Sequence, residues 1–99
     1  MSQFFAVVVQ RAAAWDHSKP SSEQPDFAPH SAHWRGLEEA RFVAMAGLMK
    51  DSMDVLFIVR AESAEEVRAR IGGDPWQKDG ITRIARVEPI DIRFGPPAP

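Results

Sequence analysis

The run FFAVVVQ, residues 4–10, is the clearest strand signal in this chain. Phenylalanine and β-branched valine favour extended backbone, and turn-type residues follow the run. A strand with one wet face should alternate apolar and polar residues. Both alternating sets of this run are apolar instead. The run therefore predicts a strand that is covered on both faces.

The segments that follow this strand predict further helices and strands. Apolar residues recur every three or four positions along residues 26–41, which favours a helix that Asp26 can cap. Ser63 and Glu66 form a capping box for a second helix, which Gly72-Gly73 ends after residue 71. We also expect strands at residues 42–49, 53–61 and 82–94, a loop at residues 12–25 and a single helical turn at residues 75–79.

The order of these elements, βαββαβ, predicts the fold. Two right-handed split βαβ units give an α+β, ferredoxin-like domain with a four-stranded antiparallel sheet in the order 4-1-3-2. This order puts the last strand on an edge, where Pro89 is tolerated because proline cannot donate to a ladder. We expect one domain over residues 1–94 and a disordered, proline-rich tail over residues 95–99.

Composition excludes several classes of function. The chain has 99 residues, a net charge of −2 and no cysteine, which excludes disulfides and thiolate chemistry. Its Lys and Arg are scattered and do not alternate with aromatic residues, so a nucleic-acid partner is not expected. No segment approaches the roughly 20 apolar residues that span a bilayer. We therefore expect a cytoplasmic protein that does not contact membranes.

Two of the predicted strands need cover on the sheet face that the helices leave open. Residues 4–9 and 56–59 are apolar on both faces, while both helices are expected on one face only. A second copy of the chain, packed sheet against sheet, is the simplest cover for the open face. The sequence therefore predicts a homodimer.

The predicted topology brings two distant residues, His30 and Asp74, to one edge of the sheet. A neutral imidazole beside a carboxylate is a workable pair for proton transfer at neutral pH. The loop that carries Trp15 and Asp16 should reach the same edge. We expect the pocket there to bind a small, planar substrate, with Trp15, Asp16, Trp34 and Trp76 as its contacts.

Each of these residues also has a simpler explanation. His30 could be a packed histidine bonded to a backbone carbonyl, and Asp74 could merely cap the turn that Pro75 begins. A large aromatic residue is more often packing than a ligand platform. His30 and His33 lack the i, i+4 spacing of two metal ligands on a helix, so no metal and no cofactor is expected.

Six short motifs, in their order and spacing, carry a resemblance to a known family. They are FFAVVV at residues 4–9, WDHSKP at 15–20 with EQ at 23–24, His30, AGL at 46–48, EEVR at 65–68 and DPW at 74–76. Together they resemble the YCII-related family of the dimeric α+β barrel superfamily. The resemblance covers the chain up to about residue 90.

The resemblance implies a homodimer with a small pocket in each subunit. Its histidine and Asp-Pro aspartate, taken as the catalytic pair of the family, correspond to His30 and Asp74. Most family members have no assigned reaction. One similar branch removes chloride from chlorinated hydroxyquinols, and muconolactone isomerases share the fold.

These observations lead to one main hypothesis and two alternatives. The main hypothesis is a cofactor-independent enzyme that uses His30 and Asp74 for acid–base isomerisation or elimination on a small aromatic or lactone-like metabolite. The first alternative is a non-catalytic dimeric protein that binds a small molecule or assists another protein. The second is a structural dimer without a pocket.

Overall fold

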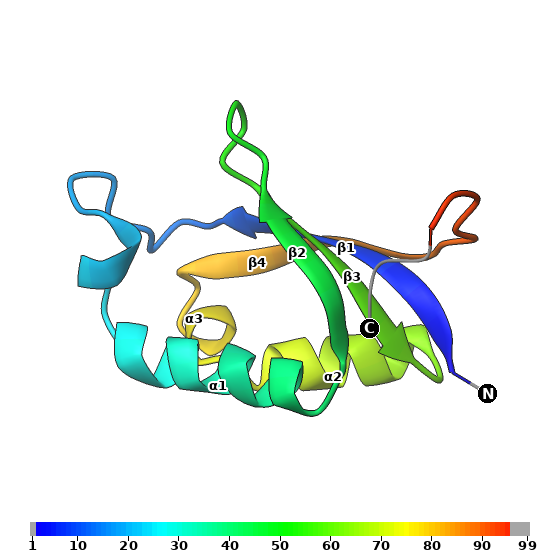
Figure 1. The fold of residues 1–99 in the computed structure, drawn as a ribbon. Helices are drawn as coiled ribbons and strands as arrows, with labels where there is room; N and C mark the ends of the chain where they lie inside the picture. The colour runs from blue at the N-terminus through cyan, green and yellow to red at the C-terminus, as the bar shows by residue number, and fades with distance from the viewer. Residues whose placement is uncertain (1, 96–99) are drawn as a thin grey trace.

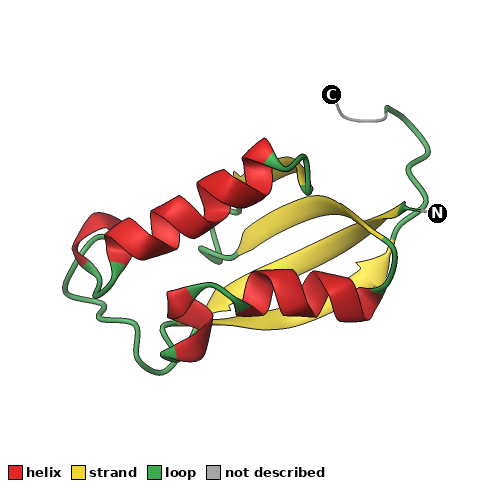
Figure 2. Ribbon diagram, turned by 90° about the horizontal axis from the view of Figure 1, so that it is seen from below, coloured by secondary structure: helices red, strands yellow, loops and turns green. Residues whose placement is uncertain are grey.

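The computed structural model describes residues 2–95 and has the predicted ferredoxin-like α+β fold. A four-stranded antiparallel sheet in the order β2-β3-β1-β4 carries its helices on one face (Figures 1 and 2). The predicted strand order is therefore confirmed. In chain order the elements are β1 (Gln3–Arg11), the 3-10 helix η1 (Ser21–Glu23), α1 (Phe27–Glu39), β2 (Val43–Leu48), β3 (Val55–Ala61), α2 (Ala64–Gly72), α3 (Pro75–Lys78) and β4 (Thr82–Pro89).

Strand β1 lies inside the sheet, between β3 and β4, as its apolar sequence requires. Val7 pairs with Phe57 on one side and with Val87 on the other. On the helix-facing side, Phe5 and Val7 are almost completely buried and pack in one cluster with Val67 and Ile71 of α2. Burial of each such side chain contributes about 1.5–3 kcal/mol, which makes this cluster the main anchor of α2 on the sheet.

Helix α2 begins at the predicted capping box. The Ser63 hydroxyl accepts a hydrogen bond from the Glu66 backbone N–H at 3.1 Å. The glycines at the end of α2 have a different role from the predicted helix stop. Gly73 has φ −72°, so no left-handed residue ends this helix. A Cβ at Gly73 would instead lie 2.8 Å from His33 Cε1, so this glycine is required for the close approach of α1 and α2.

The ends of several elements also differ from the prediction. Asp26 does not cap α1 with its side chain, because its backbone is left-handed at φ 58°. Helix α1 ends at Glu39, and Arg41 is left-handed at φ 61°. Strand β4 ends at Pro89 rather than at residue 94, because proline lacks the N–H that the ladder needs. Strand β4 is an edge strand, as predicted.

The sheet face opposite the helices is apolar at its centre. The registers of the central strands place Ala6 opposite Ile58 and Val8 opposite Leu56 on this face. Met45 pairs with Ile58 and is 51% exposed. Together with residues 90–94, these two side chains line a groove of about 410 Å³. A homodimer through this face stays a prediction.

The proline-rich tail was expected at residues 95–99, and residues 96–99 lie outside the described part of the chain. Within residues 2–95, no helix has the length and apolar character needed to cross a membrane.

Candidate functional site

Asp74 is held at the junction of α2 and α3 by its role as a helix cap. One of its carboxylate oxygens, Oδ1, accepts a hydrogen bond from the Trp76 backbone N–H at 3.0 Å. Pro75 occupies the first position of α3, where its fixed φ suits a helix and its missing N–H costs nothing. The sequence Asp-Pro-Trp therefore fixes a carboxylate in the interior, and only 1% of its side chain is exposed.

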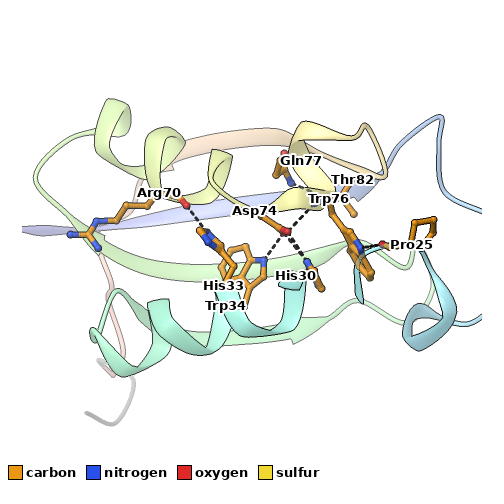
Figure 3. Close-up of polar contacts among 9 residues, drawn as sticks. All are labelled: Pro25, His30, His33, Trp34, Arg70, Asp74, Trp76, Gln77 and Thr82. Carbon is orange, nitrogen blue, oxygen red and sulfur yellow. Dashed lines mark hydrogen bonds and ion pairs between the residues drawn. The ribbon is translucent and has the colours of Figure 1, made fainter. Parts of the chain in front are cut away.

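His30 lies in α1 and directs its ring at this carboxylate from 44 residues away (Figure 3). Its Nδ1–H donates to both Asp74 oxygens, at 2.9 Å to Oδ1 and 2.8 Å to Oδ2. Trp34 lies one helical turn later, and its Nε1–H donates to Asp74 Oδ2 at 2.8 Å. Helix α1 thus supplies two donors on one face, and the backbone of α3 supplies a third.

These donors determine the charge state of Asp74. Burial alone raises the pKa of its carboxyl, because removal from water disfavours the anion. The hydrogen bonds from His30, the Trp76 backbone and Trp34 outweigh burial and hold this pKa below its usual value. Asp74 is therefore a carboxylate at neutral pH and acts only as an acceptor.

The acceptor fixes the tautomer of His30. A carboxylate can only accept, so the neutral ring must carry its proton on Nδ1. Its other nitrogen, Nε2, has no hydrogen-bond partner within residues 2–95. The ring also stacks on the Trp76 indole, with a centroid distance of 3.5 Å and an interplanar angle of 10°. Its orientation is therefore set both by a charge and by an aromatic surface.

A pocket of about 280 Å³ opens beside this pair. Its walls come from the end of β1, the loop after it, α1, α3 and the β2–β3 hairpin, so the predicted convergence on one edge is present. Small-molecule sites typically start at about 300 Å³, which makes this pocket suitable for one small ring. Five residues predicted for the site line it: His30, Asp74, Trp15, Trp34 and Trp76.

Asp16, the sixth predicted residue, does not line this pocket. Its Oδ1 accepts hydrogen bonds from the Ser18 backbone N–H at 2.9 Å and from the Ser18 hydroxyl at 2.6 Å. These bonds lower the pKa of the Asp16 carboxyl. The Asp16 side chain thus closes a local turn in its own loop, and a substrate contact at Asp16 stays a prediction.

Gln24 organises the same loop and was missed from the sequence. It is 3% exposed, its Oε1 accepts from the Asp16 backbone N–H, and its Nε2–H groups donate to the carbonyls of Asp16 and Lys19. These bonds fix the loop next to Trp15. The Trp15 ring packs edge-on against the Trp76 ring, with 5.5 Å between the ring centres. The sequence marks Gln24 only as part of the EQ motif at residues 23–24 and carries no signal for its burial.

The remaining candidates separate into lining and structural residues. Arg11 lines the pocket, with its guanidinium carbon 4.3 Å from the centre of the Trp15 ring. His33 donates from Nε2 to the Arg70 carbonyl at 2.8 Å and joins the two long helices. Within residues 2–95, no group of three or more His, Asp or Glu side chains could hold a metal ion.

Comparison with known proteins supports the fold. No family model matches this chain, and no curated protein does. Among solved structures, the chain is similar to the 5-chloro-2-hydroxyhydroquinone dehydrochlorinase TftG from Burkholderia phenoliruptrix AC1100, in complex with 2,5-dihydroxybenzoquinone. The two are 22% identical over 92% of this chain and 95% of that chain, with a TM-score of 0.51. At this level of identity, the likeness establishes a shared fold.

Proposed function

We propose that this protein is a small enzyme that moves a proton on a planar, aromatic or lactone-like metabolite, in an isomerisation or an elimination. The observation that carries the proposal is the bond from His30 Nδ1–H to the buried Asp74 carboxylate, 2.8 Å long, at the wall of a pocket. It leaves Nε2 as the ring nitrogen that can take a proton from a ligand.

The two residues have different roles in this proposal. His30 acts first as general base and then as general acid, both through Nε2. Asp74 holds the ring in the tautomer that leaves Nε2 unprotonated, and it stabilises the imidazolium that forms. Trp76 keeps the ring plane fixed by stacking on it.

Both types of reaction balance in atoms and electrons without a further reactant. In an elimination, Nε2 takes a proton from a C–H or O–H group, the freed electron pair forms a new π bond, and the leaving group departs with its own bonding pair. In an isomerisation, the imidazolium returns the proton to a different carbon. Such assistance accelerates a reaction about 10²–10⁴-fold, which is adequate only for a substrate with an already acidic proton.

Two further observations support this class of reaction. The similar solved structure is, by its title, a dehydrochlorinase of a chlorinated hydroxyhydroquinone. The motifs around His30 and Asp74 resemble the YCII-related family, in which this pair is taken as catalytic, and we propose that the chain belongs to that family.

We further propose that two copies pair through the open sheet face. Support comes from the apolar pairs Ala6–Ile58 and Val8–Leu56 at its centre and from the exposed Met45 beside them. Sedimentation equilibrium should show a dimer for the native sequence and a monomer for Met45→Glu, since the new charge would be buried between the sheets. A native chain that sediments as a monomer would exclude this pairing.

Turnover of a defined substrate panel tests the enzymatic proposal. The panel contains 5-chloro-2-hydroxyhydroquinone, other chlorinated hydroquinols and unsaturated lactones. Turnover is measured as chloride release and as a change in ultraviolet absorbance. We expect turnover of at least one compound, a loss of about 10²–10⁴-fold in His30→Gln, and a change below about twofold in His33→Gln. Binding without turnover across the panel would instead support the non-catalytic alternative.

A further inference from the structure

The polar groups that line the pocket are mostly occupied by bonds within the protein. The Gln10 side chain bonds Asp54 and Arg83, and the Thr82 hydroxyl accepts from Gln77. Asp74 takes three side-chain and backbone donors, as described above. The indole N–H groups of Trp34 and Trp76 donate to Asp74 and to the Pro25 carbonyl.

Four polar groups of the described lining residues have no such bond: the Arg11 guanidinium, the Trp15 indole N–H, the Ser21 hydroxyl and His30 Nε2. Arg11 is a cation, half-buried at the end of β1. Among the residues that line this pocket it is the only lysine or arginine. The residues around the pocket therefore offer a ligand one fixed positive charge, one indole N–H donor, one hydroxyl and one proton acceptor.

Arg11 is positioned to use this charge on a ligand. Its guanidinium lies over the Trp15 ring, at 4.3 Å from the centre. A cation–π contact of this kind leaves guanidinium N–H groups available to oxygen acceptors, and none of them has a hydrogen-bond partner within residues 2–95. Trp15 is itself 7% exposed and packs against Trp76, so this contact holds the cation in a defined place.

We propose that Arg11 selects substrates that carry a negatively charged oxygen, as a carboxylate or a phenolate on a small planar ring. This inference rests on the proposed function, since it takes the pocket beside His30 to be the substrate site. Among the described residues that line the pocket, the only other charged group is the Asp74 carboxylate, which repels an anion. Arg11 opposes this repulsion, and it also stabilises the negative charge that grows on the substrate when His30 removes a proton.

Binding of a matched pair of ligands tests the role of Arg11. Benzoate and benzamide have nearly the same shape and differ in charge, and titration followed by NMR measures even weak dissociation constants. We expect the native protein to bind benzoate about tenfold more tightly than benzamide, as one charge-assisted hydrogen bond predicts. Arg11→Gln should bind the two ligands equally, whereas Arg11→Lys should keep part of the preference because it keeps the charge.

Arg68→Gln is the matched control. Arg68 is exposed on α2 and does not line the pocket, so its loss should leave the preference for benzoate unchanged. Equal binding of both ligands by the native protein, or an unchanged preference in Arg11→Gln, would overturn the inference. The first comparison needs no variant, so it holds even if Arg11→Gln fails to fold.

The binding assay also separates this inference from the proposed function. A protein that prefers benzoate but turns over no compound of the panel would contradict only the enzymatic proposal. A protein that turns over a substrate with no preference for the anion would contradict only the role of Arg11. His30→Gln should keep the preference for benzoate while turnover is lost.

Discussion

Two histidines of one helix, three residues apart, serve different purposes in this molecule. His30 donates from Nδ1 to the buried Asp74 carboxylate and lines a pocket with its other nitrogen free. His33 donates from Nε2 to a backbone carbonyl, that of Arg70, and contacts Gly73. Both rings tie α1 to the region around the end of α2, yet only His30 is arranged for proton transfer.

The hydrogen-bond partner of each histidine, rather than the histidine itself, determines what its ring can do. A backbone carbonyl cannot compensate the charge of an imidazolium, whereas a carboxylate stabilises it and supports base catalysis. The partners also require opposite tautomers, with the proton on Nδ1 of His30 and on Nε2 of His33. The packed histidine that the sequence allowed at position 30 is found at position 33.

The largest expected effect is a loss of turnover when the negative charge of Asp74 is removed and the shape of its side chain is kept. Asp74→Asn gives His30 a neutral partner that both donates and accepts, so the tautomer and the imidazolium lose their support. We expect turnover to fall about 10²–10⁴-fold, measured as kcat on whichever compound the native enzyme converts. An Asp74→Asn enzyme with native kcat would show that the carboxylate does not serve catalysis.

The next effect is on stability. Asp74→Ala leaves the Trp34 indole and the Trp76 backbone N–H without their acceptor and removes the cap of α3. We expect a loss of about 2–4 kcal/mol in the free energy of unfolding, measured in urea. Removal of the His33 bond by His33→Gln should cost only about 0.5–1.5 kcal/mol. Equal losses in the two variants would contradict the contrast between the two histidines.

Two neighbouring glycines provide a finer test of the His33 contact. A Cβ at Gly73 would meet His33 Cε1 at 2.8 Å, whereas nothing lies within 4 Å of a Cβ at Gly72. Gly73→Ala should displace the ring and destabilise the protein by about 1 kcal/mol. Gly72→Ala, at the last position of α2, should be neutral or stabilising by up to about 1 kcal/mol. Thermal unfolding of the pair checks both signs, and the reverse order would refute the close approach.

The smallest expected effect is on the dependence of stability on pH. The pKa of Asp74 is lowered on folding, so the unfolded chain binds more protons between the folded and unfolded values. Its contribution to stability is therefore present above the unfolded pKa, near 3.9, and is lost as pH falls through the folded pKa. Urea unfolding from about pH 6 to pH 3 should show a steeper loss for the native protein than for Asp74→Asn. Parallel curves would contradict a lowered pKa at this carboxyl.

Local rules predict much of this fold from the sequence. The apolar run at residues 4–9, the capping box at Ser63 and the edge position of Pro89 each depend on a few neighbouring residues and one general principle. Their agreement on a single strand order is enough to place His30 and Asp74 at one edge of the sheet.

What sequence reasoning missed depends on contacts between distant segments. Gln24 is buried only because its loop folds around it. The hydrogen bonds from Ser18 to the Asp16 carboxylate, which close a turn within the loop, were also not predicted. Gly73 fits a helix stop in sequence, whereas the constraint on it comes from a ring on another helix.

The position of the proton on each histidine ring is the sharpest test of the proposal that His30 Nε2 is the base. Side-chain nitrogen NMR at about pH 9, where an ordinary imidazole is neutral, distinguishes the two tautomers of each histidine. We predict that the neutral ring of His30 carries its proton on Nδ1 and that the neutral ring of His33 carries it on Nε2. A proton on Nε2 of the neutral His30 ring would contradict the proposed mechanism, because that nitrogen could not then act as the base.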